Sequence, residues 1–363
     1  MPEGLSVLPV PGLPEVVPGD DLAALIVSRV TAAGLDVVDG DVLVVSSKVA
    51  SKSLGLVAAD RETAVRAATR RVVAERSIDG GRVTRVVESA AGPVMAAAGV
   101  DASNTGALDG VLLLPEDPDG VCASLLGRLQ AAFEVQRLAV VLSDTSGRPW
   151  RMGQVDFALG AAGLCVVDDL RGVSDADGRT LSVTTRAVAD EVAAAADLVK
   201  GKAAGVPVAL VRGVAEFVTG SFGEDGGRSL VRTGPEDWFV TGAAEAVRAA
   251  LGVAPGSELA EHVGIPSISD EPVAARVRRG VAVALAAREL DDGVGVDVGT
   301  DAVVVTGGDP VDRGIVAARI GVALWGEGFA SSIEPAAQRG SDSVRVLVLA
   351  RWPLAPHRRG FAP

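Results

Sequence analysis

Short apolar runs, each ending in polar residues, recur through the first 215 positions of the chain. Runs rich in Val, Leu and Ile predict buried β-strands at residues 5–10, 40–48, 111–114, 140–142, 164–167 and 206–211. Apolar positions spaced three and four apart predict helices after Asp20, after Asp119 and over residues 186–198. The pattern predicts an α/β fold (mixed α+β).

Two further segments are predicted to be helical. Residues 60–77 are interpreted as an amphipathic helix with solvated arginines, and residues 153–163 as a helix packed through Val155, Phe157, Ala158 and Leu159. Residues 251–272 are rich in Gly, Pro and Ser, which predicts a linker. Beyond it we expect a helix over 273–290, a strand over 302–305, a helix opened by Asp309-Pro310 and a strand over 344–349.

A chain of 363 residues favours two domains. We predict a domain over residues 1–250 and a smaller C-terminal α/β domain over 251–363.

Composition excludes several classes of protein. A formal net charge of −13 argues against a broad basic face for nucleic acid. There is no uncharged apolar run of about 18 residues and no secretory signal, so we expect a cytoplasmic protein that does not bind membranes. Cys122 and Cys165 form no disulfide framework, and Cys122 is expected in the core. His262 and His357, both expected in loops, come too late for histidine-based zinc or triad chemistry in the first 260 residues.

Candidate chemistry lies where the predicted strands end. Ser143, Asp144 and Thr145 follow the strand 140–142, and Arg148 and Arg151 come shortly after. A carboxylate, hydroxyls and guanidinium groups are typical of a metal-bound phosphate site. An Asx-turn in which Asp144 caps the next element explains the same residues equally well.

Other strand ends carry weaker signals. The strand over 40–48 ends in Ser47 and Lys48, and Lys52 follows it; a solvated lysine is the simpler interpretation of Lys52. Asp190 and Glu191 are adjacent and so point in different directions, which argues against a catalytic pair. The loop 199–205 has glycines and lysines but lacks the Walker spacing.

Taken together, these loops resemble those of the coenzyme F-420-0:L-glutamate ligases (gamma-glutamyl ligases), including the amino-terminal half of the actinobacterial two-domain enzymes. The ordered segments that carry the resemblance are 12–14, 41–47 with Lys52, 99–104, 112–115, 117–120, 143–148, 188–191 and 207–213.

The resemblance implies a gamma-glutamyl-ligase-like domain with mixed sheets and a homodimer. It also implies GTP-dependent formation of an acyl phosphate on the deazaflavin precursor, amide formation with L-glutamate, and further gamma-linked additions. Two Mg²⁺ or Mn²⁺ ions, and K⁺, are the implied cofactors. By resemblance, Asp101 and Asp144 hold one metal and Thr145 a second, while the GTP site is formed by Leu13, Pro14, Glu15, Val16, Ser47, Lys52 and Asn104.

Arg148 and Arg151 are added on their charge, as partners for a substrate carboxylate or phosphate. With Asp144, we predict Arg148 and Lys202 as catalytic residues.

The chain departs from the family pattern in two places. Lys202 stands about where archaeal members have an acidic ligand, so either the second metal binds more weakly or the ammonium group supplies part of its charge. The segment 251–363 is short for the flavin-binding reductase domain of actinobacterial relatives. Alternatives are a GTP- or deazaflavin-binding protein without ligase activity, a ligase with another acceptor, and a bifunctional enzyme with an FMN-dependent reductase tail.

Overall fold

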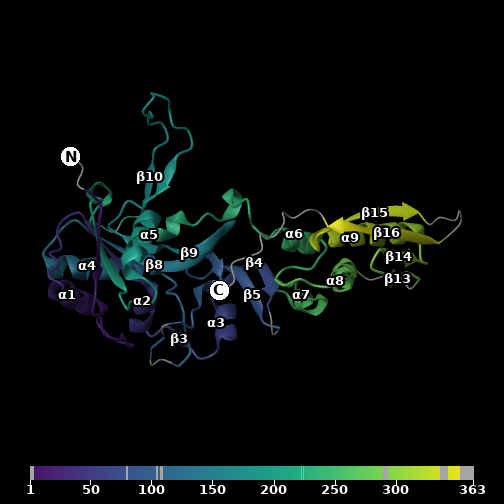
Figure 1. The fold of residues 1–363 in the computed structure, drawn as a ribbon, viewed down its shortest axis with the longest axis horizontal. Helices are drawn as coiled ribbons and strands as arrows, with labels where there is room; N and C mark the ends of the chain where they lie inside the picture. Colours follow the sequence, from purple (N-terminus) through teal and green to yellow (C-terminus); the bar gives the residue numbers. More distant parts are fainter. Residues whose placement is uncertain are drawn as a thin grey trace. The chain divides into compact units, whose positions relative to one another are not determined.

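A five-stranded mixed sheet is the centre of the larger of two units into which the chain divides (Figure 1). The computed structural model describes residues 4–78, 81–103, 105–106, 109–221, 223, 225–288, 293–335 and 342–351. The first unit comprises Met1–Arg71 and Val87–Asp237, and the second comprises Val72–Val86 and Trp238–Pro363. The boundary predicted after residue 250 falls at the end of α6 (Ala243–Ala250), a helix of the second unit.

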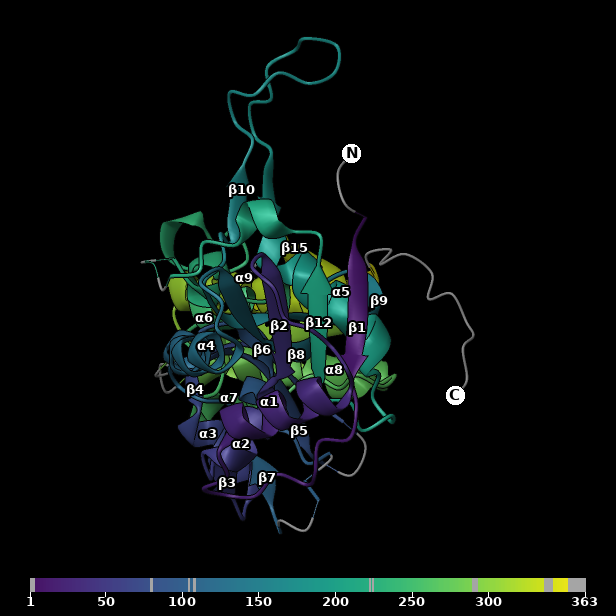
Figure 2. The ribbon, with the colours of Figure 1, turned by 90° about the vertical axis from the view of Figure 1, so that its left-hand side faces the viewer.

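The central sheet has the order β1-β12-β2-β8-β9, with bounds β1 Ser6–Val10, β12 Val208–Arg212, β2 Asp41–Ser46, β8 Leu138–Arg148 and β9 Arg151–Ala162. Only β2 and β8 pair in parallel within it, and the other neighbours are antiparallel. In Figure 2, β2, β8, β12 and β1 are seen side by side. The expected α/β class with mixed sheets is confirmed.

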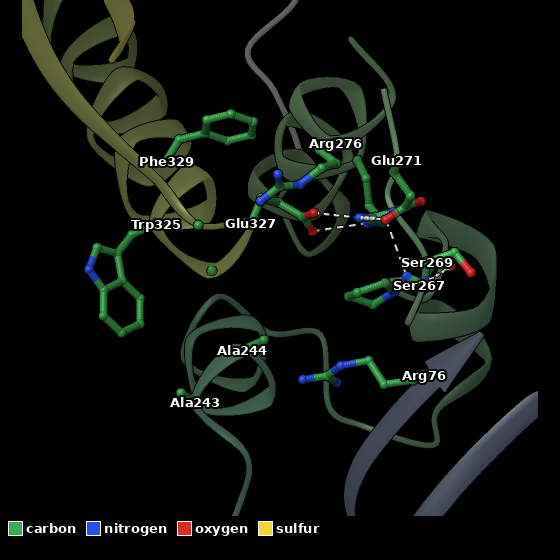
Figure 3. Close-up of a pocket in the computed structure, with 14 residues that line it drawn as sticks. Arg76, Ala243, Ala244, Ser267, Ser269, Glu271, Arg276, Trp325, Glu327 and Phe329 are labelled. Carbon is green, nitrogen blue, oxygen red and sulfur yellow. Dashed lines mark hydrogen bonds and ion pairs between the residues drawn. The ribbon is translucent and has the colours of Figure 1, made fainter. Parts of the chain in front are cut away.

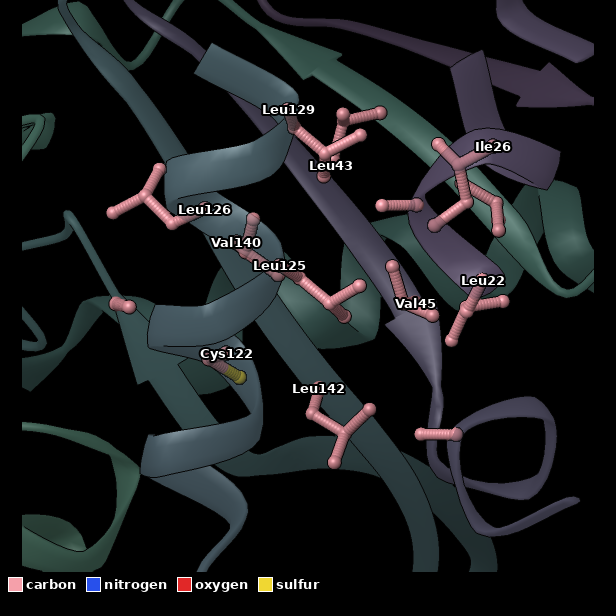
Figure 4. Packing of buried hydrophobic residues seen from close by; sticks show 14 of the residues in the cluster. Leu22, Ile26, Leu43, Val45, Cys122, Leu125, Leu126, Leu129, Val140 and Leu142 are labelled. Atoms are coloured by element: carbon pink, nitrogen blue, oxygen red, sulfur yellow. The ribbon is translucent and has the colours of Figure 1, made fainter. Parts of the chain in front are cut away.

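Helices cover both faces of this sheet because its central strands are apolar on both sides. Along β2, Leu43 and Val45 pack with α1 (Leu22–Ala32) and α4 (Pro118–Phe133), as Figure 4 shows. The alternate residues Val42 and Val44 pack with α5 (Val188–Lys200). Full burial of one such side chain contributes roughly 1.5–3 kcal/mol. Cys122 is fully buried in the first cluster, as predicted.

Smaller elements of the first unit complete it. They are α2 (Ser47–Ser53), α3 (Arg61–Ala67), the β3–β7 pair (Val57–Ala58, Val111–Leu112), and the β10–β11 arm (Val167–Asp169, Thr185–Ala187), which projects from the body of the unit in Figures 1 and 2. A three-stranded sheet is formed by β4 (Thr69–Ser77), β5 (Val83–Ser89) and β6 (Val94–Ala96), of which residues 72–86 are assigned to the second unit.

The second unit is built on an antiparallel sheet, β13-β14-β16-β15, with bounds β13 Gly295–Val298, β14 Ala302–Thr306, β16 Ser343–Arg351 and β15 Phe329–Pro335. Helices α8 (Val273–Ala286) and α9 (Pro310–Gly326) supply apolar side chains to the same core as β14. Asp309 caps α9 and Pro310 occupies its first turn, which agrees with the sequence pattern.

Two predicted helices are wrong. Of the residues 153–163 predicted to be helical, all but the last lie in strand β9 (Arg151–Ala162), where Val155, Phe157 and Leu159 are two apart, the spacing of one strand face. The helix predicted over 60–77 ends at Ala67, and β4 follows it because Thr69 and the valines after it favour a strand that can pair with β5.

Several local predictions also need correction. Asp21, not Asp20, caps α1, and Asp117, not Asp119, caps α4; Asp119 instead accepts the backbone N–H groups of Ala161 and Gly227. The predicted linker contains α7 (Glu258–Val263), so His262 lies in a helix, while His357 falls outside the described residues. The strand expected over 164–167 lies instead at β10, which begins at Val167. Among the described residues, no helix has the length and apolar character needed to cross a bilayer.

Candidate active site

The parallel pairing of β2 with β8 brings the polar end of β2 next to a polar stretch inside β8. Ser46 of β2 is opposite Ser143 of β8 in the register, so the next residues of the two segments, Ser47 and Asp144, lie close together. There, the hydroxyl of Ser47 donates to Oδ1 of Asp144 over 3.0 Å. These two residues, 97 positions apart in the chain, form the centre of the candidate site.

Asp144 lies inside β8, opposite Phe157 of β9, and not at a turn. The Asx-turn interpretation is therefore wrong. Burial raises the pKa of Asp144 to about 6 and the nearby Asp156 carboxylate adds to the rise, although the Ser47 hydroxyl, the backbone N–H of Thr145 and the Lys48 charge act in the opposite direction. No described residue forms an ion pair with Asp144.

Two lysines of α2 contact two of the predicted site residues. Lys48 and Lys52 are four positions apart and so share one face of the helix. The Lys48 ammonium donates to Oδ2 of Asp101 (2.5 Å) and to the Ser103 hydroxyl (2.7 Å). Although burial alone would raise the pKa of Asp101, the bonds from Lys48 and Ser103 lower it below its usual value.

Lys52 is 5% exposed and forms an ion pair with Oε1 of Glu15, so it is not the solvated lysine of the simpler interpretation. Gly106 lies against the same carboxylate, since a Cβ at this position would come within 2.0 Å of Glu15 Oε1. Three segments predicted to form the nucleotide site therefore converge at this pair: the one that contains Glu15, the one that contains Lys52 and the loop that ends at Gly106.

Asp156 is a site residue that the sequence interpretation missed. It lies directly across from Thr145 in the β8–β9 register. Its Oδ1 accepts from the Thr145 hydroxyl (2.5 Å), and its Oδ2 accepts from the Ser143 hydroxyl (2.9 Å). Asp156 would have been identified if the pairing of β9 with β8 had been predicted.

Lys200, at the end of α5, is a second missed residue. Its buried ammonium donates to the Ser143 hydroxyl (2.6 Å) and to Oδ2 of Asp156 (2.8 Å). Burial of Asp156 would raise its pKa, but the Lys200 charge and the bonds from Lys200, Thr145 and Ser143 outweigh that effect and lower it. Asp156 is therefore held as a carboxylate next to Thr145.

Lys202 reaches the same cluster from the loop after α5. Its Nζ donates to the Thr145 hydroxyl and lies 3.7 Å from Oδ1 of Asp156. The side chain is 55% exposed, so its ammonium group is accessible to solvent and to ligands.

The remaining predicted residues lie at varying distances from this cluster. Leu13 packs partly buried against the core, Val16 is buried and Pro14 is exposed. Arg148 lies four positions beyond Asp144 in the same strand, about 13 Å along it at ~3.3 Å per residue. It is exposed, as is Arg151 opposite it, and it lines a cavity of about 430 Å³ together with Asp156, Asp190 and Glu191. Asn104 lies outside the described residues.

The donor set fits a hard divalent cation. Asp101, Asp144 and Thr145 offer oxygen atoms, the ligands that Mg²⁺ and Mn²⁺ prefer. A bound cation would also lower the pKa of Asp144, because it would stabilise a carboxylate that has no ion-pair partner among the described residues. Within the same part of the chain, no group of three or more His, Cys, Asp or Glu side chains is arranged as a ligand set, so a metal here would need the hydroxyl, water or substrate oxygens to complete its shell.

Known proteins are similar in sequence to the part of the chain that contains this site. Residues 12–213 match the family described as F420-0:Gamma-glutamyl ligase. The chain is 40% identical over 255 residues to the coenzyme F420:L-glutamate ligase of Methanothermobacter thermautotrophicus, which covers 65% of this chain and 99% of that protein. It is 41% identical over 246 residues to the enzyme of the same name from Halobacterium salinarum, covering 61% of this chain and 90% of that protein. The matched family segment ends before α6, so it does not reach the α6–α9 part of the second unit.

Proposed function

Because the chain belongs to the F420-0:gamma-glutamyl ligase family, we propose that it is a ligase that joins L-glutamate to the deazaflavin precursor coenzyme F420-0 through an amide bond. The observation that carries this proposal is the meeting of Asp144, Ser47 and the Lys48–Asp101 pair just beyond the last parallel residue pair of β2 and β8, Ser46 and Ser143. A carboxylate is a poor electrophile, so its hydroxide-like leaving group must first be converted into a better one.

In the proposed reaction, a carboxylate oxygen of the precursor attacks the γ-phosphorus of GTP and GDP leaves, which gives an acyl phosphate. The amine of L-glutamate then attacks the acyl carbon, phosphate leaves and the amine loses a proton. Repetition on the new γ-carboxylate would extend the chain by gamma linkage. Phosphoryl transfer of this kind depends on positioning and charge neutralisation.

Side chains at the strand ends suit these needs. Asp101 and Asp144 would hold a divalent cation, which supplies charge neutralisation at the phosphate oxygens when it is bound. The buried Lys52, fixed by Glu15, offers a cation at the segments proposed to bind GTP. Asp156 accepts a hydrogen bond from the Thr145 hydroxyl, so the lone pairs of that oxygen are left for Lys202 and for a ligand.

The position of Lys202 bears on what supplies the positive charge at the second-metal site. Its ammonium already donates to Thr145 and lies near Asp156, where a second cation would be expected. We propose that this ammonium supplies part of the positive charge that two metals supply in relatives with an acidic residue there. K⁺ and a homodimer are further proposals that rest on family resemblance alone.

The test is to incubate the protein with GTP, Mg²⁺, L-glutamate and coenzyme F420-0, and to follow the product by mass spectrometry. We expect a product heavier by one glutamyl residue and one GDP released for each bond formed. GTP binding without product would favour a binding protein that lacks ligase activity. Repeating the assay with other acceptors and with ATP defines the specificity.

A further inference from the structure

The second unit contains a cavity of about 390 Å³ that the proposed ligase reaction does not use. It is lined by β4, the start of α6, the loop before α8, α8 itself, and the turn from α9 into β15 (Figure 3). This volume is within the roughly 300–1,000 Å³ of small-molecule sites. Every residue that lines it belongs to the second unit.

The hydrogen-bond acceptors of the two acidic residues that line the cavity are already used. Arg279 donates Nη1 and Nη2 to the two carboxylate oxygens of Glu271 (2.6 and 2.7 Å). It also donates Nε and Nη2 to those of Glu327 (3.0 and 2.5 Å). These contacts are drawn in Figure 3. The carboxylates are thus committed to one buried guanidinium and are poorly placed to recruit a cationic ligand.

Arg76, by contrast, retains an open donor edge. Its Nη1 makes both of its bonds, to the backbone oxygen of Glu75 (2.6 Å) and to the buried carboxylate of Glu245. Within the described chain, Nε and Nη2 have no hydrogen-bond partner, and the side chain is 34% exposed. This side-on edge is the one that binds a carboxylate or phosphate through two parallel bonds.

The opposite wall of the cavity offers aromatic and planar surfaces. Trp325, near the end of α9, is 54% exposed and lines the cavity. The Arg276 guanidinium lies over the ring of Phe329, 4.5 Å from its centroid. Gly328 permits this packing, since its φ is +80° and a Cβ there would be 2.9 Å from Nη2 of Arg276. An aromatic ring system is suited to such a wall because it stacks on indole and guanidinium groups.

From the open edge of Arg76 and the Trp325 wall, we propose that this cavity binds a small organic anion in which a phosphate or carboxylate is joined to a flat aromatic ring system, of about the size of a mononucleotide. Arg76 binds the anionic group and Trp325 stacks on the ring. The site is separate from the residues proposed to carry out ligation.

Calorimetric titration of the full-length protein with AMP tests the proposal, with adenosine and inorganic phosphate as the two halves of the probe. We expect AMP to bind more tightly than either half. Arg76→Lys keeps a positive charge beside Glu245 but removes the two-bond edge, and it should weaken AMP binding about tenfold. Trp325→Ala should weaken it about fivefold with little effect on folding, because the indole is largely exposed.

Arg82→Lys is the matched control, since Arg82 is exposed and belongs to the same segment, 72–86, of the second unit. It should leave AMP binding unchanged. Absence of AMP binding in the wild type would overturn the proposal, and so would equal affinity in wild type, Arg76→Lys and Trp325→Ala. Ligase turnover measured on the same samples separates this result from a failure of the proposed ligation.

Discussion

Both units gather charged side chains at partly or fully buried positions, but they neutralise them differently. In the second unit, Arg279 joins Glu271 and Glu327, and all four carboxylate oxygens accept a bond from it. In the first unit, Lys200 neutralises Asp156, yet Asp144 has no ion-pair partner among the described residues. The comparison suggests that a saturated charge cluster maintains the fold, whereas a carboxylate left unneutralised is available to a ligand.

The largest effect should come from Asp144→Asn. Loss of the charge removes a proposed metal ligand, and we expect turnover to fall on the order of 10³-fold. The amide is nearly isosteric and can still accept the Ser47 hydroxyl bond, so the melting temperature should not fall. Product formation is followed by mass spectrometry, with the exposed Asp36→Asn as control. A normal glutamylation rate in Asp144→Asn would contradict the proposed role of this site.

Arg279→Met should affect stability and leave ligation intact. It leaves two carboxylates without their cation, which costs about 3–5 kcal/mol when a buried pair is broken. Calorimetry of the full-length protein should show an early transition, and turnover measured below that transition should match the wild type. The neighbouring exposed Arg278→Met is the matched control. A wild-type thermogram for Arg279→Met would show that the saturated cluster does not stabilise the second unit.

The burial of Asp144, which has no ion-pair partner among the described residues, predicts a characteristic pH dependence. Its pKa is about 6 in the folded protein against an ordinary 3.8, so the fold binds this proton more tightly than the unfolded chain does. The contribution of protonated Asp144 to the free energy of unfolding is therefore fully present below about pH 3.8 and is lost as the pH rises through about 6. Metal-free Asp144→Asn should be more stable than the wild type by ~3 kcal/mol at pH 8, and the difference should fall below about 1 kcal/mol near pH 4.

Denaturant unfolding at the two pH values measures this difference, and Mg²⁺ at pH 8 should then stabilise only the wild type. Equal stability of the two proteins at pH 8 without metal would mean that Asp144 is already neutralised. The contrast between the saturated Arg279 cluster and an unneutralised Asp144 would then not hold.

The sequence predicted secondary structure best where a pattern of residues is compatible with only one kind of element. The buried strands containing Val42 and Val140 were predictable because their apolar runs are short and end in polar residues. The pairing of those strands was not predictable, because parallel register depends on contacts distant in sequence. For the same reason, an alanine-rich segment with Val155 and Phe157 was interpreted as a helix, although β8 provides it with a strand partner.

That error also hid part of the site. Once residues 153–163 were assigned to a helix, Asp156 had no reason to lie beside Thr145, and the Lys200 that pairs with it had no known partner. Ser47, Lys52, Asp101 and Asp144 were selected from strand ends and family resemblance, which do not require the register to be known. The cavity beside Arg76 could not be predicted, because its lining comes from five segments between residues 76 and 329.

Lys202→Ala is expected to have the smallest effect, about a fivefold loss of turnover, since an exposed ammonium contributes on the order of 1 kcal/mol. If this ammonium supplies charge that a second metal supplies in relatives, higher Mg²⁺ should restore part of the loss, and Lys202→Arg should retain most of the wild-type rate. Turnover as a function of Mg²⁺ concentration measures both effects. Identical kinetics for Lys202→Ala and the wild type over the whole titration would exclude the substitution of a metal by Lys202. Asp144, which forms no ion pair with a described residue, would then have to be neutralised by bound metal and substrate alone.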